Sequence, residues 1–328
     1  MQLRMLNFAI QGFPFLIRRR QSSAIVITFG ETNLLAALFV SLTLQAPLSI
    51  GVRSNILTRH KLLVEDMPLL QKIWANVKFE VGLRFWQFAY RYASQITVQT
   101  PQAKAEFLVN FNIPENKVEV IENDLPPKFK LRYFGNRKPG ELRSLLFVGN
   151  ETRIKGFDVL VKAIPQFHQC TPSIKQITLV GVSDNAVQAA SAELAKTGID
   201  IVWRRRHNDI PSLMQEHDLL VVPSREDQFP NVVLEALAIG LPVVGSAVDG
   251  IKYMLADDWI LFPPGDVAGL VRCVSRVAEP AGYVRAMDIA RERASYFDFD
   301  WEDRYIDILE RNMELRQRPL EAGRITGQ

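Results

Sequence analysis

Short apolar runs alternate with longer amphipathic segments along most of the chain, and polar turns separate them. Apolar runs of this length are typical of buried parallel strands, and the longer segments are typical of helices. In the first third, the pattern predicts strands at Ser23–Thr28, Pro47–Arg53, Gln95–Gln99 and Lys117–Glu122, and helices at Thr32–Leu44, about Val64–Tyr92, and Gln102–Phe111. Such alternation predicts a parallel sheet with right-handed crossovers.

Two local signals place helix starts within this first series. Thr28 and Glu31 have the spacing of a capping box, in which a hydroxyl and a carboxylate satisfy free amides at a helix start. Thr100 followed by Pro101 matches an N-cap residue with proline at the first helical position. We therefore expect one helix to begin just after Glu31 and another just after Thr100.

A second series of strands and helices begins at Leu145, after a proline- and glycine-rich basic stretch that is typical of a linker. The fold class predicted is α/β, with two Rossmann-like doubly wound parallel-sheet domains. The predicted divisions are an N-terminal domain (1–124), a linker (125–142), a second domain (143–296), and a C-terminal helix and tail (297–328).

The most informative stretch runs from Val221 to Val244. An apolar strand (Leu219–Val222) ends at Pro223-Ser224, where a polar turn follows. A helix begins at Pro230 or Asn231 and ends before Gly240. Asp227 and Glu235, with seven residues between them, then both face the carboxyl end of the strand, where open α/β sheets bind ligands. The alternative is an ordinary strand–helix unit with two solvated acids.

Composition excludes several kinds of site. The two cysteines, Cys170 and Cys273, lie far apart, which is typical of a reducing compartment, and neither they nor the four histidines have metal-ligand spacing. Asp298 and Asp300 form the only D-x-D motif, but Asp300 precedes a predicted helix, so capping is expected rather than metal binding. We expect no metal and no nucleic-acid partner.

Charge is distributed unevenly along the chain. Residues 1–140 contain 18 basic against 9 acidic side chains, whereas the remainder has 21 against 27. The basic part suits an anionic surface or acceptor, but a solvated basic face is an equal alternative.

The aromatic, basic segment Phe79–Ala93 is a candidate for membrane contact, and core packing is the alternative. No membrane span or secretory signal is predicted.

Several motifs together resemble a known family. The runs FVGNETRIKGFDVLVKAI, DIPSLMQEHDLLVVPSREDQFPNVVLEALAIGLPVVGSAVDGIKYML and ILFPPGD resemble the nucleotide-sugar domain of retaining glycosyltransferases of family 4, which have the GT-B fold. The first half resembles the family's acceptor domain more loosely, through TFGETNLLAAL, GVRSN and KVEVIEND. The resemblance implies that this N-terminal acceptor domain is shortened.

The resemblance also implies roles for the donor-site residues. Glu235 would bind the nucleotide ribose hydroxyls, and Asp227, where the family more often has glutamate, would contact the transferred sugar, with Glu226 as an alternative. Lys155 would bind the donor phosphates, Asn150 stands where the family has arginine, and Arg153 could supply that charge. The remaining implied donor-binding residues are Gly149, Gln228, Phe229, Pro230 and Asn231.

Two hypotheses follow for the whole chain. The first is a retaining, metal-independent glycosyltransferase that uses a nucleotide-diphosphate sugar as co-substrate and no other cofactor, with a glycan or lipid-linked acceptor in cell-surface polysaccharide or lipopolysaccharide synthesis. The second is a non-catalytic or partial nucleotide-sugar-binding module that needs a partner chain.

Arg53 and Asn55 are the acceptor-side candidates; Arg53 either faces the interdomain cleft or caps a strand end. The expected location is the cytoplasm, with peripheral contact to the inner face of an anionic cytoplasmic membrane.

Overall fold

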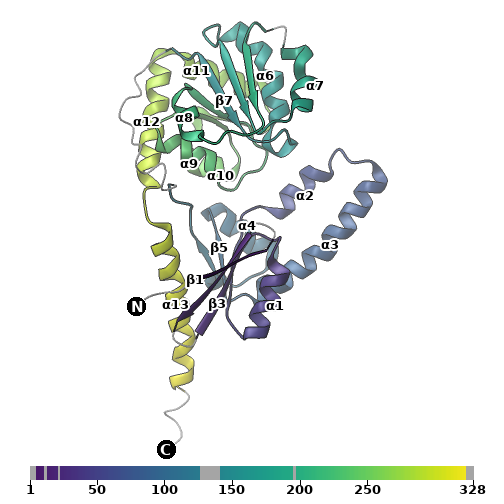
Figure 1. The fold of residues 1–328 in the computed structure, drawn as a ribbon, viewed down its shortest axis with the longest axis vertical. Helices are drawn as coiled ribbons and strands as arrows, with labels where there is room; N and C mark the ends of the chain where they lie inside the picture. The colour runs from purple at the N-terminus through teal and green to yellow at the C-terminus, as the bar shows by residue number, and fades with distance from the viewer. Residues whose placement is uncertain (1–4, 11–12, 21–22, 126–140, 195–196, 323–328) are drawn as a thin grey trace, which may run out of the picture. The chain divides into compact units, whose positions relative to one another are not determined.

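The computed structural model describes residues 5–10, 13–20, 23–125, 141–194 and 197–322. The chain divides into two compact units (Figure 1). Unit 1 comprises residues 1–55, 64–122 and 300–328, and unit 2 comprises residues 56–63 and 123–299. The predicted linker at 125–142 falls almost entirely on residues 126–140, which lie outside the described residues.

Unit 1 is built on a six-stranded sheet of order β1-β2-β3-β4-β5-β6. Its strands are β1 (Met5–Ile10), β2 (Phe13–Arg20), β3 (Ser23–Phe29), β4 (Leu48–Gly51), β5 (Gln95–Val98) and β6 (Val118–Val120). Strands β3 to β6 are mutually parallel, as the alternation of elements predicted. Strands β1 and β2, which were not predicted, are antiparallel to their neighbours and lie at one edge of the sheet. A two-residue connection, at 11–12 or 21–22, is too short for the crossover that parallel strands need.

The helices of this part of the chain are α1 (Leu34–Leu44), α2 (Ile56–Val64), α3 (Leu69–Tyr92) and α4 (Pro101–Phe111), with a 3₁₀ turn at Glu115–Lys117. The long helical region predicted from about Val64 to Tyr92 is confirmed from Leu69 onward, but it begins later than predicted because Pro68 stands at the N-cap of α3. Proline disfavours helical conformation in the residue before it, which ends α2 before this point.

The two predicted helix starts had opposite outcomes. Thr100 is confirmed as an N-cap, since its hydroxyl accepts a hydrogen bond from the Ala103 amide at 3.0 Å. The capping box at Thr28 and Glu31 was wrong: β3 continues through Thr28 to Phe29, and α1 begins only after Asn33, which makes no side-chain cap. Pairing of β3 with β4 therefore took precedence over the local capping signal.

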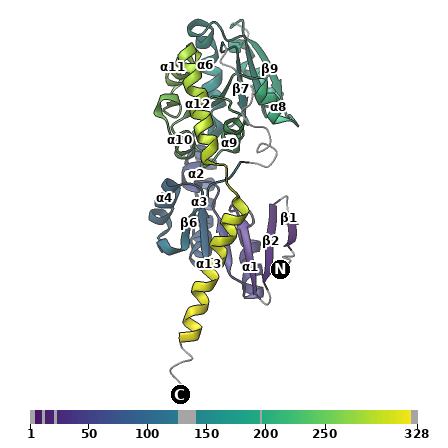
Figure 2. The ribbon, with the colours of Figure 1, turned by 90° about the vertical axis from the view of Figure 1, so that its left-hand side faces the viewer.

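The final helix, α13 (Trp301–Ala322), belongs to unit 1 although it follows the last residue of unit 2 in the sequence (Figures 1 and 2). The Trp301 and Tyr305 rings are stacked, with centroids 4.8 Å apart, and the Tyr305 and Ser49 hydroxyls share a hydrogen bond of 2.9 Å. Ile308 and Leu309 are buried against the same cluster as Ile25 and Ile27 of β3. This end of the chain therefore completes the core of unit 1.

Unit 2 contains a wholly parallel six-stranded sheet. Its strands are β7 (Ser144–Val148), β8 (Gln176–Val180), β9 (Asp200–Arg204), β10 (Leu219–Val222), β11 (Val243–Ser246) and β12 (Leu261–Phe262). Its helices are α6 (Phe157–Cys170), α7 (Asp184–Leu194), α8 (Ile210–Gln215), α9 (Asn231–Ala238), α10 (Asp249–Leu255), α11 (Val267–Ala278) and α12 (Pro280–Tyr296), with 3₁₀ turns η2 (Arg153–Lys155) and η3 (Asp258–Ile260).

The strand order of unit 2 is β9-β8-β7-β10-β11-β12 when read from one edge. In chain order within the unit this is 3-2-1-4-5-6, the doubly wound order of the Rossmann fold. The direction of winding reverses between β7 and β10, which are hydrogen-bonded neighbours. The loops that follow these two strands therefore meet at the topological switch point, where such sheets bind ligands.

Among the described residues, no helix combines the length and the apolar character that crossing a bilayer requires.

Candidate functional site

The candidate site lies where the loops after β7 and β10 meet in unit 2. The backbone amide of Arg225, in the second loop, donates to the carbonyl oxygen of Ile154, in the first, at 2.7 Å. The Arg225 guanidinium makes two bonds to the Asp158 carboxylate, at 2.6 and 2.7 Å, and one to the Arg153 carbonyl at 2.8 Å. These bonds hold the two loops together at the switch point.

Glycines allow the backbones around this site to approach closely. Gly156 has a φ of +69°, in the left-handed region, and a Cβ there would collide with the carbonyl oxygen of Pro223. A Cβ at Gly250, in α10, would collide with the carbonyl oxygens of Asp227 and Gln228. The loop after β10 is therefore confined between two glycine positions that tolerate no side chain without a backbone shift.

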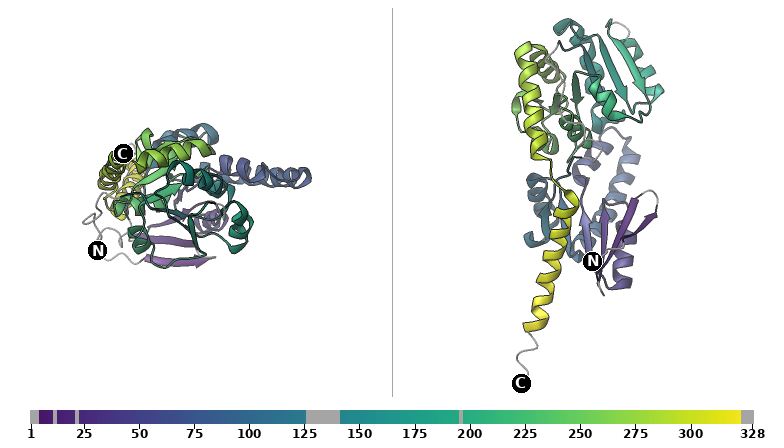
Figure 3. Two further views of the ribbon diagram at one scale, coloured as in Figure 1. Left: turned by 90° about the horizontal axis from the view of Figure 1, so that it is seen from above. Right: turned by 60° about the vertical axis from the view of Figure 1, so that its left-hand side comes forward.

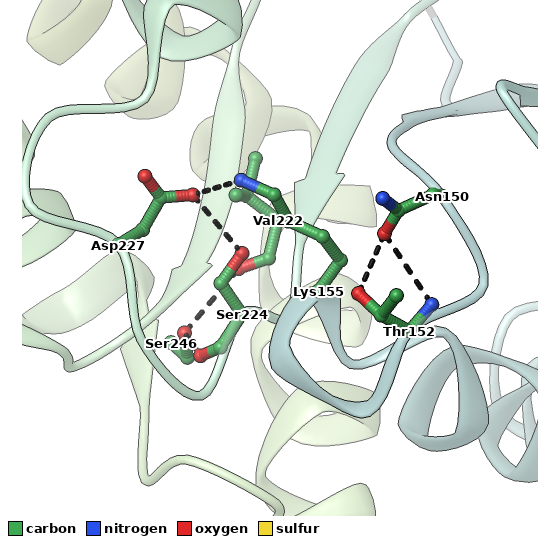
Figure 4. A network of polar contacts seen from close by, with 7 residues as sticks. All are labelled: Asn150, Thr152, Lys155, Val222, Ser224, Asp227 and Ser246. Carbon is green, nitrogen blue, oxygen red and sulfur yellow. Dashed lines mark hydrogen bonds and ion pairs between the residues drawn. The ribbon is translucent and has the colours of Figure 1, made fainter. Parts of the chain in front are cut away.

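The predicted residues Lys155 and Asp227 come together across the two loops (Figure 4). Lys155 Nζ lies 2.6 Å from Asp227 Oδ2, and the Ser224 hydroxyl donates to the same oxygen at 3.4 Å. The Lys155 side chain remains 36% exposed, whereas that of Asp227 is 12% exposed. The pair thus presents an ammonium group that is positioned by a carboxylate and still open to a further anion.

Two buried serines near the ends of β10 and β11 hold this pair in position through hydrogen bonds. Ser246, the last residue of β11, is fully buried, and its hydroxyl donates to the carbonyl oxygen of Ser224 (Figure 4). Ser224 is itself buried and is the residue whose hydroxyl reaches Asp227. The position of the turn is therefore tied to the adjacent strand β11.

Helix starts bring amide donors to the same edge of the sheet. Helix α6 begins directly after Gly156, and α9 begins at Asn231 with Pro230 as its N-cap residue. The first amides of a helix have no intrahelical partners and favour anions, so Lys155 and the start of α6 together suit a phosphate group. Glu235 is half-buried in α9, the helix that follows the loop carrying Asp227.

The other predicted donor residues have more varied surroundings. Gly149 is half-buried and its amide donates to the Val180 carbonyl at 2.9 Å, while Glu226 is half-buried in the loop after β10. Gln228, Phe229 and Pro230 are buried; the Phe229 ring packs edge-on against Phe297 at 5.5 Å. Phe229 therefore contributes to the core of unit 2.

Asn150 and Arg153 are exposed in the first loop. The Asn150 side-chain oxygen accepts hydrogen bonds from the Thr152 hydroxyl at 2.6 Å and from the Thr152 amide at 3.4 Å, and so folds its own loop (Figure 4). Asn231, at the start of α9, accepts from the Asn123 side chain at 2.9 Å.

The two acceptor-side candidates belong to unit 1. The Arg53 guanidinium lies over the Phe29 ring at 4.8 Å and over Trp301 at 5.9 Å, and its burial lowers the pKa of the guanidinium. Asn55 donates to Glu106 at 2.9 Å. Both side chains thus take part in the internal packing of unit 1.

No group of three or more potential metal-ligating side chains is found in the described parts of the chain. Asp300 caps the start of α13, accepting from the amides of Glu302 at 2.9 Å and Asp303 at 3.2 Å. The interpretation of the D-x-D motif as a helix cap is confirmed.

Sequence reasoning missed the residues that support the site. Arg225 and Asp158 lie far apart in the sequence, and a local pattern carries no signal for their ion pair. Ser246 ends β11 and Gly250 lies in α10, which follows that strand, where the chain returns to the same edge of the sheet. Only that general rule for strand ends could have indicated them.

Comparison with known proteins defines the class of the second unit. Residues 143–279 match the family Glycosyl transferases group 1. The fold as a whole is GT-B: sucrose-phosphate synthase from Thermosynechococcus elongatus superposes with a TM-score of 0.68 at 22% identity, covering 91% of this chain and 74% of that one.

Two curated relatives extend the comparison. An uncharacterized glycosyltransferase of Methanocaldococcus jannaschii is 26% identical over 224 residues, covering 64% of this chain and 57% of that protein. N,N'-diacetylbacillosaminyl-diphospho-undecaprenol alpha-1,3-N-acetylgalactosaminyltransferase of Campylobacter jejuni is 26% identical over 183 residues, covering 53% and 47%. The chain thus spans about half the length of these curated relatives.

Proposed function

We propose that this protein is a retaining, metal-independent glycosyltransferase that moves a sugar from a nucleotide-diphosphate donor to a glycan or lipid-linked acceptor. The observation that carries the proposal is the 2.6 Å contact between Lys155 and Asp227 at the switch point of unit 2. It lies within the region that matches Glycosyl transferases group 1. The names of the relatives support transfer of a sugar.

Each residue then has a chemical task. The leaving nucleoside diphosphate gains negative charge in the transition state, and Lys155 with the start of α6 would stabilise that charge. Asp227 would accept hydrogen bonds from the transferred sugar, and Glu235 from the vicinal ribose hydroxyls. In a retaining reaction the acceptor attacks the face from which the diphosphate departs, so both groups would share one side of the sugar.

The proposed acceptor is lipid-linked, and the proposed process is the synthesis of cell-surface polysaccharide or lipopolysaccharide. The Campylobacter jejuni relative, whose name specifies a diphospho-undecaprenol substrate, supports this choice. The excess of basic residues in 1–140 also supports work at the inner, anionic face of the cytoplasmic membrane.

The activity is tested with a panel of labelled nucleotide sugars, by measuring binding, hydrolysis and transfer. One donor is expected to bind and to be hydrolysed slowly in the absence of an acceptor. Binding without hydrolysis or transfer to any acceptor would instead favour a nucleotide-sugar-binding module that needs a partner chain. If no nucleotide sugar binds, both assignments are wrong.

The ribose contact is tested separately with Glu235→Ala. Loss of a charge-assisted hydrogen bond should weaken nucleotide binding by about 1.5–3 kcal/mol. Isothermal titration of the donor identified in the panel measures this change. Glu292→Ala, at an exposed position of α12, is the matched control and should leave the affinity unchanged. Equal affinity of Glu235→Ala and wild type would remove the ribose role.

A further inference from the structure

Helix α3 of unit 1 exposes a row of large apolar side chains along most of its length. Leu70, Trp74, Val77, Val81 and Phe88 are between 51% and 74% exposed. Their spacing of three, four or seven residues places them on one side of the helix. Solvent exposure of so much apolar surface on one helix is typical of an interaction site.

The opposite side of the same helix holds it to unit 1. Tyr90 is buried, and its ring packs edge-on against Phe107 at 4.9 Å and Phe111 at 5.0 Å, both in α4. Phe79 packs against Trp86 on the helix itself at 5.7 Å. Several aromatics of the segment 79–93 therefore serve in packing, and the exposed row extends toward the N-terminal end of α3, which projects away from the sheet of its unit (Figures 1 and 3).

Positive charge borders the apolar row on both sides. At about 100° per residue, Lys78 lies along one border, and Arg84 and Arg91 lie along the other; all three are exposed. The whole helix carries four basic residues and one acidic residue, Glu80. An apolar row with aromatic side chains between basic borders is the pattern of a helix that lies in the interface of an anionic bilayer.

The neighbouring helix α1 offers similar chemistry. It contains no charged residue, and Leu35, Phe39 and Leu42 are 51–70% exposed along one side. Helices α1 and α3 contact each other, and the Ser41 hydroxyl donates to the Tyr92 hydroxyl at 3.4 Å. Two adjacent helices of one unit therefore each carry an exposed apolar row.

We propose that the α3 face, defined by the five apolar residues above with Lys78, Arg84 and Arg91, docks unit 1 on an anionic lipid bilayer. The proposal rests on the proposed function, since a bilayer is where a lipid-linked acceptor would be presented. A second copy of the chain fits less well. Two α3 helices paired antiparallel about a two-fold axis would bring the same border of each copy together, so Lys78 would lie along the Lys78 border of the other copy, and like charges repel.

Docking is measured by flotation of the full chain with vesicles of phosphatidylcholine and phosphatidylglycerol in equal parts, and with vesicles of phosphatidylcholine alone. The wild type should float with the anionic vesicles, and added salt should weaken binding. The double variant Trp74→Glu/Val81→Glu should bind roughly tenfold more weakly or worse, because both changes place acids in the row. Lys78→Gln should weaken binding roughly fivefold.

The matched control is Val109→Glu, which adds an acid at an 84% exposed position of α4 in the same unit. It should float like the wild type. Failure of the wild type to bind anionic vesicles would overturn the proposal, as would equal binding by the double variant or equal loss in the control. A concentration-dependent dimer abolished by the double variant would assign the α3 face to a second copy instead.

Nucleotide-sugar binding in solution, measured on the same proteins, separates this proposal from the proposed function. The double variant should bind the donor as the wild type does, since its substitutions lie in unit 1 and the candidate donor site lies in unit 2. Donor binding without vesicle binding refutes only the docking proposal. Vesicle binding without any donor binding refutes only the proposed activity.

Discussion

At the scale of single residues, the Lys155–Asp227 pair combines two properties that a phosphate-binding cation needs. Asp227 holds the ammonium within 2.6 Å, while more than a third of the lysine side chain stays exposed. A fully buried lysine would lose solvation and could not reach a ligand. A fully exposed lysine would lose more side-chain entropy on binding. The half-buried position lies between these limits.

Replacing Lys155 should therefore affect the donor phosphates directly. Lys155→Ala should raise the transition-state barrier by about 1.5–3 kcal/mol or more, seen as a loss of roughly tenfold or more in kcat/KM for transfer. Lys155→Arg should recover part of the activity because the charge is kept. Lys162→Ala, which removes an exposed charge from α6, should have little effect. If it lowered transfer as much as Lys155→Ala, general charge rather than position would explain the result.

The Asp158–Arg225 pair makes a prediction about acid stability. Burial raises the pKa of the Asp158 carboxyl, but hydrogen bonds and charge from Arg225 outweigh it, so the pKa lies below the ordinary value. The pair therefore stabilises the fold above the ordinary carboxyl pKa of about 3.9. This stabilisation is lost as the pH falls through the lowered value in the folded state.

Since the Asp158 side chain is 43% exposed, solvent screening limits the contribution of the ion pair to the free energy of unfolding to about 0.5–1 kcal/mol. Asp158→Asn should lower the free energy of unfolding by that amount at neutral pH, and the difference from wild type should shrink below the ordinary carboxyl pKa. Urea unfolding at several pH values measures both. If the difference in unfolding free energy grew as the pH fell, the pKa of Asp158 would not be lowered in the folded protein.

At the scale of elements, the site depends on two loops that approach more closely than side chains allow. The turn η2 is followed by Gly156, whose backbone lies against Pro223 of the neighbouring loop. The bond from the Arg225 amide to the Ile154 carbonyl fixes the same approach from the other side. Lys155 is therefore positioned by its neighbours in the backbone as well as by Asp227.

Gly156→Ala tests this approach, with Gly198→Ala as its control in the same unit. Both glycines have positive φ values, +69° and +64°, so both substitutions place an alanine in the left-handed region and should destabilise the fold by about 1–2 kcal/mol. Only Gly156→Ala also meets a backbone atom; at Gly198 the nearest atom lies 3.7 Å from the added Cβ. Gly156→Ala should therefore be the less stable protein in thermal unfolding and should bind the donor more weakly. Equal effects of the two variants would contradict the close approach.

At the scale of the whole molecule, the last helix belongs with the first unit. Tyr305, Ile308 and Leu309 of α13 are buried in a cluster with strand β3, and Arg304 binds Glu122 at 2.9 Å. The core of unit 1 is thus assembled from segments that precede and follow the main body of unit 2 in the sequence. Its folding therefore requires residues that lie beyond residue 299.

Leu309→Ala should destabilise unit 1 by about 2–5 kcal/mol, because it leaves a cavity at a position that is only 5% exposed. Hydrogen exchange should show faster opening of β3 and β4, with β7 and β10 of unit 2 unchanged. Arg311→Ala, two residues further along on an exposed position, is the control. Equal loss of protection in both units would indicate that α13 stabilises the molecule as one cooperative body.

Much of the fold was predictable because buried parallel strands form continuous apolar runs. The strands at Ser23, Gln95 and Leu219 lie where the pattern placed them, and the cap at Thr100 follows from a hydroxyl and a proline in adjacent positions. The antiparallel strands β1 and β2 and the break at Pro68 were not predicted. Pairing direction depends on partners that a local pattern does not contain.

By itself, the sequence determined the doubly wound class of unit 2 and the loop that carries Asp227, since strand periodicity and turn residues are local properties. Only the tertiary structure decided that Lys155 lies 2.6 Å from Asp227, that Arg225 joins the two loops, and that α13 completes unit 1. The residues in contact are 67 positions apart for Arg225 and Asp158, 72 for Lys155 and Asp227, and 256 for Ser49 and Tyr305. Their geometry is set by the packing of whole strands and helices, which no short stretch of sequence encodes.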